Sequence, residues 1–491
     1  MTSLTLLHTN DVHGYITPVP QPDGSQLGGY ARRATLVQRL RARQPATLLL
    51  DAGDFYQGSR YWHAFQGQPD IRLMNLLGYD AATLGNHDFD GGLELLAARL
   101  KEAHFPVLSA NFHVPASHFL AGLWQPWVFL QTGGLRVAVF GLTIESRELY
   151  PEAFFAQGGY ITPYLETAAS LLPRLRAQAD VVILLSHLGQ LGDEEVAANV
   201  PGIDLIIGGH NHHPLPEALF VNDIPIVRGP VGAPALSETR LEIRPRQPAR
   251  LAFHRQHPLG GDIPSQPAIE AEIKGWVLPP AETIGQLGDA LDTRTEIKCV
   301  GENRAGNFFT DTLLAHFAGQ ADFGLVHMGS LRGDRIYPAG DFTENDLLEF
   351  YPFDNEPVIV RLNAPQLKQV LEHGMSTLPV PTGIFLTFSG LRVRADTSRP
   401  GEILQGDRIV VPGERIVAAE ANGQAIDFQD EHRVFRVLCD SYMASGGSGY
   451  LPMRTAEVLY RVPEGANHIL RERFRRHSPV HVPLDGRLTF I

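Results

Sequence analysis

The first half of the chain alternates short, strongly apolar runs with segments in which apolar residues recur at helical spacing. The apolar runs are rich in Val, Ile and Leu, as buried strands are, and comprise residues 4–7, 46–50, 107–110, 136–142, 181–186 and 205–208. The helical patterns lie between them, over residues 30–43, 71–77, 93–104 and 166–179. This alternation predicts an α/β domain. The first predicted helix is basic, and we expect its arginines to form a solvated face: Arg32, Arg33, Arg39, Arg41 and Arg43.

The composition changes at residues 244–267, where five prolines accompany Gly260 and Gly261. Such a stretch is typical of a domain boundary. Beyond it, helical patterns at 305–318, 344–350 and 364–374 mix with alternating strand patterns at 391–395 and 433–438, which is α+β in character. We therefore predict a first domain over 1–255, a connector with a short helix over 256–281, and a second domain over 282–491.

Composition and charge exclude several classes of protein. A chain of 491 residues is too long for a single core, and its 44% hydrophobic content is that of an ordinary globular protein. The net charge of −13 argues against a nonspecific binder of nucleic acid polymers, which would need a basic surface. No run approaches the roughly 18 apolar residues that a membrane span requires, so we expect no membrane partner.

The cysteines and the first residues bear on the compartment. Cys299 and Cys439 are far apart and form no CxxC pair, which favours free buried thiols, although a disulfide stays open. Met1-Thr2-Ser3 leads directly into an apolar run without a basic segment or a cleavage site. We therefore expect a cytoplasmic protein; a secreted chain trimmed of its signal peptide would look the same.

Five polar clusters each follow a predicted strand. They read HTNDVHG at 8–14, DAGD at 51–54, TLGNHDFD at 83–90, SHLG at 186–189 and GGHNH at 208–212. In the third cluster, Gly85 allows the backbone to turn sharply, so that its polar side chains can converge. Ligands of open α/β sheets bind beyond the carboxyl ends of the strands. Five clusters in this same position therefore predict one metal site.

The residue types in the clusters indicate which metals are expected. They offer Asp, Asn and His side chains but no thiolate, a set that suits Mn²⁺ or Zn²⁺, with Co²⁺, Fe or Mg²⁺ as alternatives. Seven candidate ligands exceed what one ion with an open position needs. They fit two divalent ions about 3.5–4 Å apart that share a bridging carboxylate and activate a water for an in-line displacement at phosphorus.

These motifs resemble the five signature motifs of the calcineurin-like metallophosphoesterases. The residues of these motifs are similar to those of the 5′-nucleotidase branch, which also includes UDP-sugar hydrolases and 2′,3′-cyclic-nucleotide phosphodiesterases. The resemblance covers nearly the whole chain, because this branch carries a C-terminal substrate domain. It implies an N-terminal α/β metallophosphoesterase sandwich followed by an α+β domain.

The resemblance also implies roles for individual residues. One metal ion would be held by Asp11, His13, Asp54 and His212, and the other by Asp54, Asn86, His187 and His210, so that Asp54 bridges the pair. The nucleotidases often have Gln at the position of His212. His87 would stabilise the developing charge or protonate the leaving oxygen, oriented by Asp90.

In the second domain, the resemblance implies a nucleotide site with two stacking aromatic rings. Phe353 with Asn355, and Tyr442 with Ser448 in a Gly-rich loop, are the candidates, although both rings can also be core residues. Where the family has Asn-Gly-Gly-Gly-Ile-Arg, residues 327–332 read HMGSLR, so that only Arg332 keeps its role as a substrate contact. The residues expected to determine substrate specificity therefore differ from the family pattern, while the metal-binding motifs match it.

These features together predict a dimetal-dependent hydrolase of nucleotide phosphoesters. The leading hypothesis is a 5′-nucleotidase that releases phosphate from nucleoside monophosphates by attack of a metal-bridging hydroxide. A 2′,3′-cyclic-nucleotide phosphodiesterase or a nucleotide-sugar pyrophosphohydrolase is the alternative, and a non-catalytic nucleotide sensor is a remote one. The expected partner is a small-molecule nucleotide, and the oligomeric state stays open.

Overall fold

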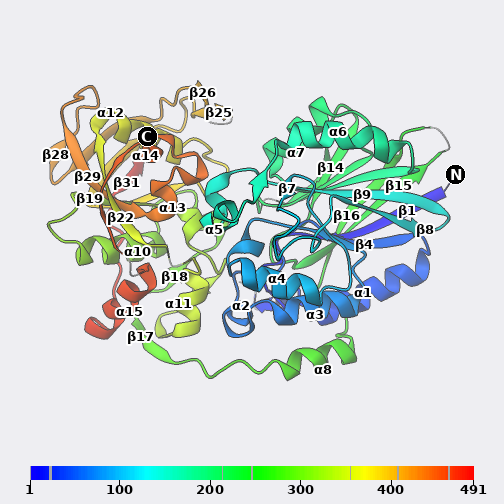
Figure 1. The fold of residues 1–491 in the computed structure, drawn as a ribbon. Helices are drawn as coiled ribbons and strands as arrows, with labels where there is room; N and C mark the ends of the chain where they lie inside the picture. Colours follow the sequence, from blue (N-terminus) through cyan, green and yellow to red (C-terminus); the bar gives the residue numbers. More distant parts are fainter. Residues whose placement is uncertain are drawn as a thin grey trace. The chain divides into compact units, whose positions relative to one another are not determined.

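The computed structural model describes residues 2–20, 25–212, 214–244, 247–353, 355–405, 408–462 and 465–491. The chain divides into two compact units, Met1–Pro279 and Pro280–Ile491 (Figure 1). Each unit has its own hydrophobic core. In the described part of the chain, no helix combines the length and the apolar character that crossing a bilayer requires.

The first unit contains two six-stranded sheets, with the orders β16-β15-β1-β4-β5-β6 and β13-β14-β12-β11-β9-β8. Four strands of the first sheet run parallel: β1 (Thr2–Thr9), β4 (Thr47–Asp51), β5 (Ala81–Thr83) and β6 (Val107–Leu108). Four of the second do the same: β9 (Leu135–Thr143), β11 (Val181–His187), β12 (Leu205–Gly208) and β14 (Ile224–Arg228). The antiparallel strands are β15 (Ala235–Ile243), β16 (Arg250–Pro258), β8 (Trp127–Thr132) and β13 (Leu215–Val221).

Successive side chains along each strand point to opposite faces of the sheet and therefore pack in different hydrophobic clusters. Leu4 and Leu6 of β1 belong to the same buried cluster as Val137 of β9, between the two sheets. Leu7 belongs instead to a cluster with the helices on the outer face of the first sheet: α1 (Tyr30–Arg43), α3 (Gln68–Leu77) and α4 (Leu93–Glu102). The second sheet is covered by α6 (Tyr164–Arg176) and α7 (Gln190–Asn199) (Figure 1). The predicted α/β sandwich is therefore confirmed.

The arginines of α1 do not all face solvent. Arg33 is 0% exposed, lies 4.2 Å over the ring of Tyr30 and donates a hydrogen bond to the Tyr79 hydroxyl at 3.3 Å. The prediction of a solvated arginine face is wrong for this residue. The position of Arg33 in the sequence could have indicated its burial. It lies three residues after Tyr30 and four before Val37, both buried on the same face of the helix.

The segment expected to connect the domains contains the end of β16 and the helix α8 (Pro267–Gly275). Gln266 caps α8 by accepting a hydrogen bond from the backbone N–H of Ile269, and Ile269 joins the core beneath α1. Arg72 of α3 and Glu272 of α8 form an ion pair at 3.4 Å. This helix therefore belongs to the first unit, which ends at Pro279.

The second unit is built on a five-stranded mixed sheet of order β23-β19-β29-β22-β30. Its strands are β23 (Leu386–Ser389), β19 (Phe323–His327), β29 (Val434–Asp440), β22 (Pro357–Asn363) and β30 (Glu457–Arg461). A four-stranded sheet adds β28 (Gln424–Ala425), β27 (Ile416–Ala421), β24 (Leu391–Ala395) and β31 (Leu488–Phe490). The main helices are α10 (Arg304–His316), α11 (Glu344–Phe350), α12 (Ala364–Gly374) and α15 (Ala466–Arg476). This mixture is the predicted α+β domain.

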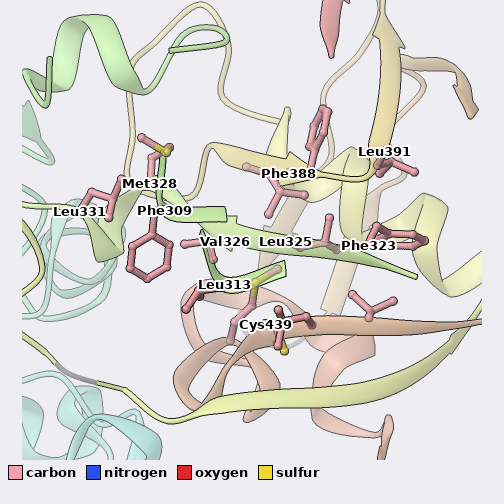
Figure 2. Close-up of a cluster of buried hydrophobic side chains, with 14 of the residues drawn as sticks. Phe309, Leu313, Phe323, Leu325, Val326, Met328, Leu331, Phe388, Leu391 and Cys439 are labelled. Carbon is pink, nitrogen blue, oxygen red and sulfur yellow. The ribbon is translucent and has the colours of Figure 1, made fainter. Parts of the chain in front are cut away.

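The core of the second unit joins α10 to the central sheet. Phe309 and Leu313 of α10 pack in one cluster with Leu325 of β19 and Phe388 of β23 (Figure 2). Cys439 lies in the same cluster, and both cysteines are free and buried, which confirms the prediction of free buried thiols.

Candidate metal centre

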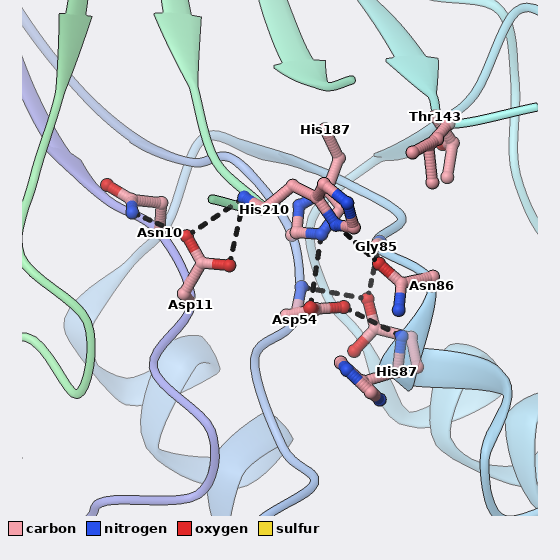
Figure 3. Close-up of polar contacts among 12 residues, drawn as sticks. Asn10, Asp11, Asp54, Gly85, Asn86, His87, Thr143, His187 and His210 are labelled. Carbon is pink, nitrogen blue, oxygen red and sulfur yellow. Dashed lines mark hydrogen bonds and ion pairs between the residues drawn. The ribbon is translucent and has the colours of Figure 1, made fainter. Parts of the chain in front are cut away.

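The polar clusters predicted from the sequence follow the carboxyl ends of parallel strands in the first unit. Asp11 and His13 follow β1, Asp54 follows β4, and Asn86 follows β5. In the second sheet, His187 ends β11, and His210 and His212 follow β12. The two sheets face each other, so the loops of both sheets reach one place, where the side chains converge (Figure 3).

Five of the predicted ligands have left-handed backbone conformations. Their φ angles are 47° at Asp11, 52° at His13, 57° at Asp54, 76° at His210 and 57° at His212. A non-glycine residue held in this region costs on the order of 1–3 kcal/mol and persists only where the surroundings fix it. Such strain is typical of functional sites, and here it is concentrated on the side chains that would bind metal.

The first ligand group is Asp11, His13, Asp54 and His212, whose donor atoms all lie within 4.8 Å of one another. The Nδ1 atom of His13 lies 2.7 Å from the carbonyl oxygen of Gln57, which can only accept, so Nδ1 carries the proton. Nε2 of His13 then lies 3.0 Å from Nε2 of His212. Two ring nitrogens that face each other beside two carboxylates are suited to a shared cation.

The second group is centred on Asp54 and His187. Nε2 of His187 and Oδ2 of Asp54 form a buried ion pair at 3.1 Å, and neither atom has a further hydrogen-bond partner among the described residues. His187 donates through Nδ1 to the carbonyl oxygen of Ala52 at 2.7 Å, so its Nε2 atom is the one that faces Asp54. Asn86 Oδ1 lies 2.9 Å from Nδ1 of His210. The facing atoms of Asp54 and His187 fit a metal ion between them once Nε2 has lost its proton.

The pKa values of the group reflect this charge arrangement. Burial alone would lower the pKa of His187, but the carboxylates of Asp54 and Asp11 raise it to about 10. Burial and the neighbouring His187 lower the pKa of His210 to about 3, so this ring is neutral and available as a ligand. Burial raises the pKa of Asp11. The carboxylates therefore draw a proton onto His187, and a divalent cation would replace that proton.

Two side chains hold the ligand loops, and the sequence analysis gave neither of them a role. Asp88 accepts hydrogen bonds from the backbone N–H groups of Gly85 at 2.8 Å and of Asp54 and Phe55 at 3.2 Å. Asn10 donates to Oδ2 of Asp11 at 2.6 Å and exchanges two hydrogen bonds with the backbone of Gly229. Both lie inside the polar motifs, and this position in the sequence could have indicated a supporting role.

His87 lies beside the ligands. Its Nδ1 atom is 2.8 Å from Oδ2 of Asp90, and its ring centroid is 5.5 Å from that of His13. Its backbone N–H donates to Oδ1 of Asp54 at 2.8 Å. A carboxylate oxygen accepts and a ring N–H donates, so Nδ1 of His87 donates to Asp90 and the ring is held in one orientation.

The structure brings together two pairs of the predicted substrate residues in the second unit. The Arg332 guanidinium lies 5.0 Å from the centroid of the Phe353 ring. The Tyr442 hydroxyl lies 3.2 Å from Oγ of Ser448 and accepts a hydrogen bond from its backbone N–H at 3.1 Å. The backbone carbonyl of Asn355 accepts from Ala466 at 3.2 Å.

His327, which occupies the family's Asn position, makes internal contacts. Its Nε2 atom lies 2.9 Å from Oγ of Ser330, and Ser330 donates to Asp440 at 3.0 Å. Burial lowers the pKa of His327. The replacement is therefore accommodated by hydrogen bonds within the domain.

Two family models match the chain, one in each unit. The model described as calcineurin-like phosphoesterase matches residues 4–214, and that described as 5′-nucleotidase, C-terminal domain, matches residues 283–455. The chain is similar to the 5′-nucleotidase of Bos taurus, with 27% identity over 99% of this chain and 91% of the relative.

Solved structures extend the likeness to the fold. The crystal structure of a 5′-nucleotidase precursor from Thermus thermophilus is similar over 100% of this chain and 99% of its own, with a TM-score of 0.84 and 26% identity. A sulfate thiohydrolase from Thermus thermophilus, at 21% identity and a TM-score of 0.76, covers 99% of this chain and 96% of its own, and shows likeness of fold alone.

Proposed function

Because the chain belongs to the 5′-nucleotidase family of calcineurin-like phosphoesterases, we propose that it hydrolyses nucleoside 5′-monophosphates to nucleosides and phosphate. The family makes it a metal-dependent phosphoester hydrolase. The observation that carries the proposal is the Oδ2 atom of Asp54, which faces ligands of both groups: His187 Nε2 at 3.1 Å and His13 Nε2 at 3.9 Å. A carboxylate shared in this way is what two adjacent cations require.

The two groups support the ligand assignment. Asp11, His13, Asp54 and His212 would hold one ion, and Asp54, Asn86, His187 and His210 the other. When bound, the two ions supply an activated water and neutralise charge on the phosphoryl oxygens. Four imidazoles with two carboxylates and one amide suit Mn²⁺ or Zn²⁺, and Co²⁺, Fe and Mg²⁺ are the ions to compare with them.

The chain's own residues would complete the reaction around this centre. Asp90 accepts from Nδ1 of His87 and fixes the orientation of the ring, so that Nε2 can carry a proton toward the leaving oxygen. Asp88 and Asn10 hold the loops that carry Asp54 and Asp11. The ligand side chains are therefore positioned before substrate arrives, which lowers the cost of reorganisation during the reaction.

In the second unit, we assign substrate recognition to Arg332, Phe353, Asn355, Tyr442 and Ser448. Arg332 lies against Phe353, so a positive charge and an aromatic face occur together, as a nucleotide requires. Tyr442 and Ser448 are joined by hydrogen bonds and would form one recognition element.

The test is substrate profiling of the protein reconstituted with Mn²⁺. 5′-AMP, 2′,3′-cyclic AMP and a UDP-sugar are incubated in parallel, and nucleotide chromatography identifies the products, since opening a cyclic phosphate releases no phosphate. We expect adenosine and phosphate from 5′-AMP at the highest kcat/KM. A higher kcat/KM for the cyclic diester or the nucleotide sugar would overturn the monoesterase assignment. The absence of turnover with both ions bound would favour a nucleotide sensor.

A further inference from the structure

His373 is buried in the second unit, in the last turn of α12, and contacts two hydrogen-bond acceptors. Nδ1 lies 2.9 Å from Oε1 of Glu402, and Nε2 lies 2.8 Å from the backbone carbonyl oxygen of Ser448. The His373 and Glu402 side chains are only 7% and 3% exposed. The histidine therefore ties three segments together, since α12, residue 402 and the Gly-rich loop are distant in the sequence.

The surroundings fix the orientation of the His373 ring. Tyr450 packs edge-on against it, with ring centroids 4.8 Å apart and an interplanar angle of 85°, and the Tyr450 hydroxyl donates to the carbonyl of Ile384. A Cβ atom on Gly449 would lie 3.0 Å from Cε1 and Nε2 of His373. A glycine at 449 therefore permits the close approach of the imidazole to the loop.

The loop residue that His373 holds has a strained backbone. Ser448 has φ of 56°, a left-handed conformation that a serine adopts only where its surroundings fix it. Its backbone N–H and its hydroxyl contact the hydroxyl of Tyr442, while its carbonyl faces His373. Ser448 is therefore held from two sides, by Tyr442 and by His373.

We propose that His373 is a positioning residue for substrate recognition: through the Ser448 carbonyl, it keeps Tyr442 and Ser448 in the conformation that receives the nucleoside. The inference rests on the proposed function, in which this loop binds the nucleoside part of the substrate. His373 acts only through Ser448 and takes no part in the chemical step.

The test compares a nucleotide with a phosphoester that has no nucleoside. In His373→Leu, the KM for 5′-AMP rises by about tenfold, the loss expected for one hydrogen bond to the loop, while kcat stays unchanged. Both kcat and KM for p-nitrophenyl phosphate stay at the wild-type values, because that substrate has no nucleoside for the loop to receive. The matched control is Glu402→Gln, which keeps a hydrogen-bonding partner for Nδ1, and its KM for 5′-AMP stays within about twofold of wild type.

Other outcomes would overturn the inference. An unchanged KM for 5′-AMP in folded His373→Leu would overturn it, and an equal loss with p-nitrophenyl phosphate would show a general effect on the fold. Should His373→Leu not fold, hydrogen exchange of the wild-type protein decides: adenosine should protect the amides of residues 446–450, and binding without that protection overturns the inference. A wild-type protein that cleaves p-nitrophenyl phosphate but no nucleotide would overturn the proposed function and this inference together.

Discussion

Oδ2 of Asp54 and Nε2 of His187 form a buried ion pair at 3.1 Å, and neither atom has a further hydrogen-bond partner in the described part of the chain. The other atoms of these side chains are occupied: Oδ1 of Asp54 accepts from the backbone N–H of His87, and Nδ1 of His187 donates to Ala52. The two atoms that a metal ion would use therefore face each other, and the proton between them is the one that the ion would replace.

Asp54→Asn should remove the bridging charge while the shape of the side chain is retained. We expect fewer than two Mn²⁺ ions per chain by elemental analysis, and a fall in kcat/KM for 5′-AMP of more than about 100-fold, because a shared ligand matters more than a residue that only supports one. Asp223→Asn, in the exposed turn before β14, is the matched control and should keep both ions. Full metal content in Asp54→Asn would contradict the bridging role.

Metal binding should release protons. In the metal-free protein the pKa of His187 is raised to about 10, so the ring is protonated at pH 7 and must lose its proton before it can bind an ion. His210, with its pKa lowered to about 3, has no such proton to lose. As pH falls, protons compete more strongly, and the affinity for Mn²⁺ should decrease by up to about tenfold per pH unit for each proton released.

Isothermal titration of Mn²⁺ in two buffers of different ionisation enthalpy measures this release directly. We expect about one proton per ion at the His187 site at pH 7. Heats that do not depend on the buffer would mean that His187 is already neutral, and the proposed replacement of its proton would then be wrong.

His87→Ala should impair the chemical step and leave the metals in place. Loss of a general acid lowers kcat by about 10²–10⁴-fold for 5′-AMP, whose ribose oxygen is a poor leaving group. The loss should be much smaller for p-nitrophenyl phosphate, since nitrophenolate leaves without protonation. Asp90→Asn, which weakens only the orientation of the ring, should fall between wild type and His87→Ala. Near wild-type turnover of 5′-AMP by His87→Ala with both ions bound would rule out this role.

The metal motifs could be predicted from the sequence because each one is local and consists of a few residues that follow an apolar strand. Because parallel strands end at the same edge of a sheet, we could predict that Asp11, Asp54 and Asn86 lie together without knowing the conformations of the loops. Features that depend on contacts between distant segments could not be predicted from the sequence. The left-handed conformation of Asp54 and the contact between His373 and Ser448 each require the folded surroundings. The orientation of the substrate residues remains a prediction for the same reason.

A buried ion pair supports the ligands of the second sheet. Asp193 and Arg228 form an ion pair at 2.8 Å, and both side chains are 0% exposed. Ser186, which precedes ligand His187, donates its hydroxyl to Asp193, and a Cβ on Gly208 would clash with Oδ2 of Asp193. The pair therefore lies directly beneath the ends of β11 and β12.

Arg228→Met should lower the free energy of unfolding by about 3–5 kcal/mol, because it leaves the Asp193 carboxylate buried without its cation. Urea unfolding followed by circular dichroism measures the change. Arg147→Met breaks an exposed pair with Glu152 and should cost no more than about 1 kcal/mol. The double variant Asp193→Leu/Arg228→Met should recover most of the loss, but not all, since Ser186 then lacks its acceptor. If the double variant were as unstable as Arg228→Met, packing around the guanidinium, and not the unpaired charge, would explain the loss.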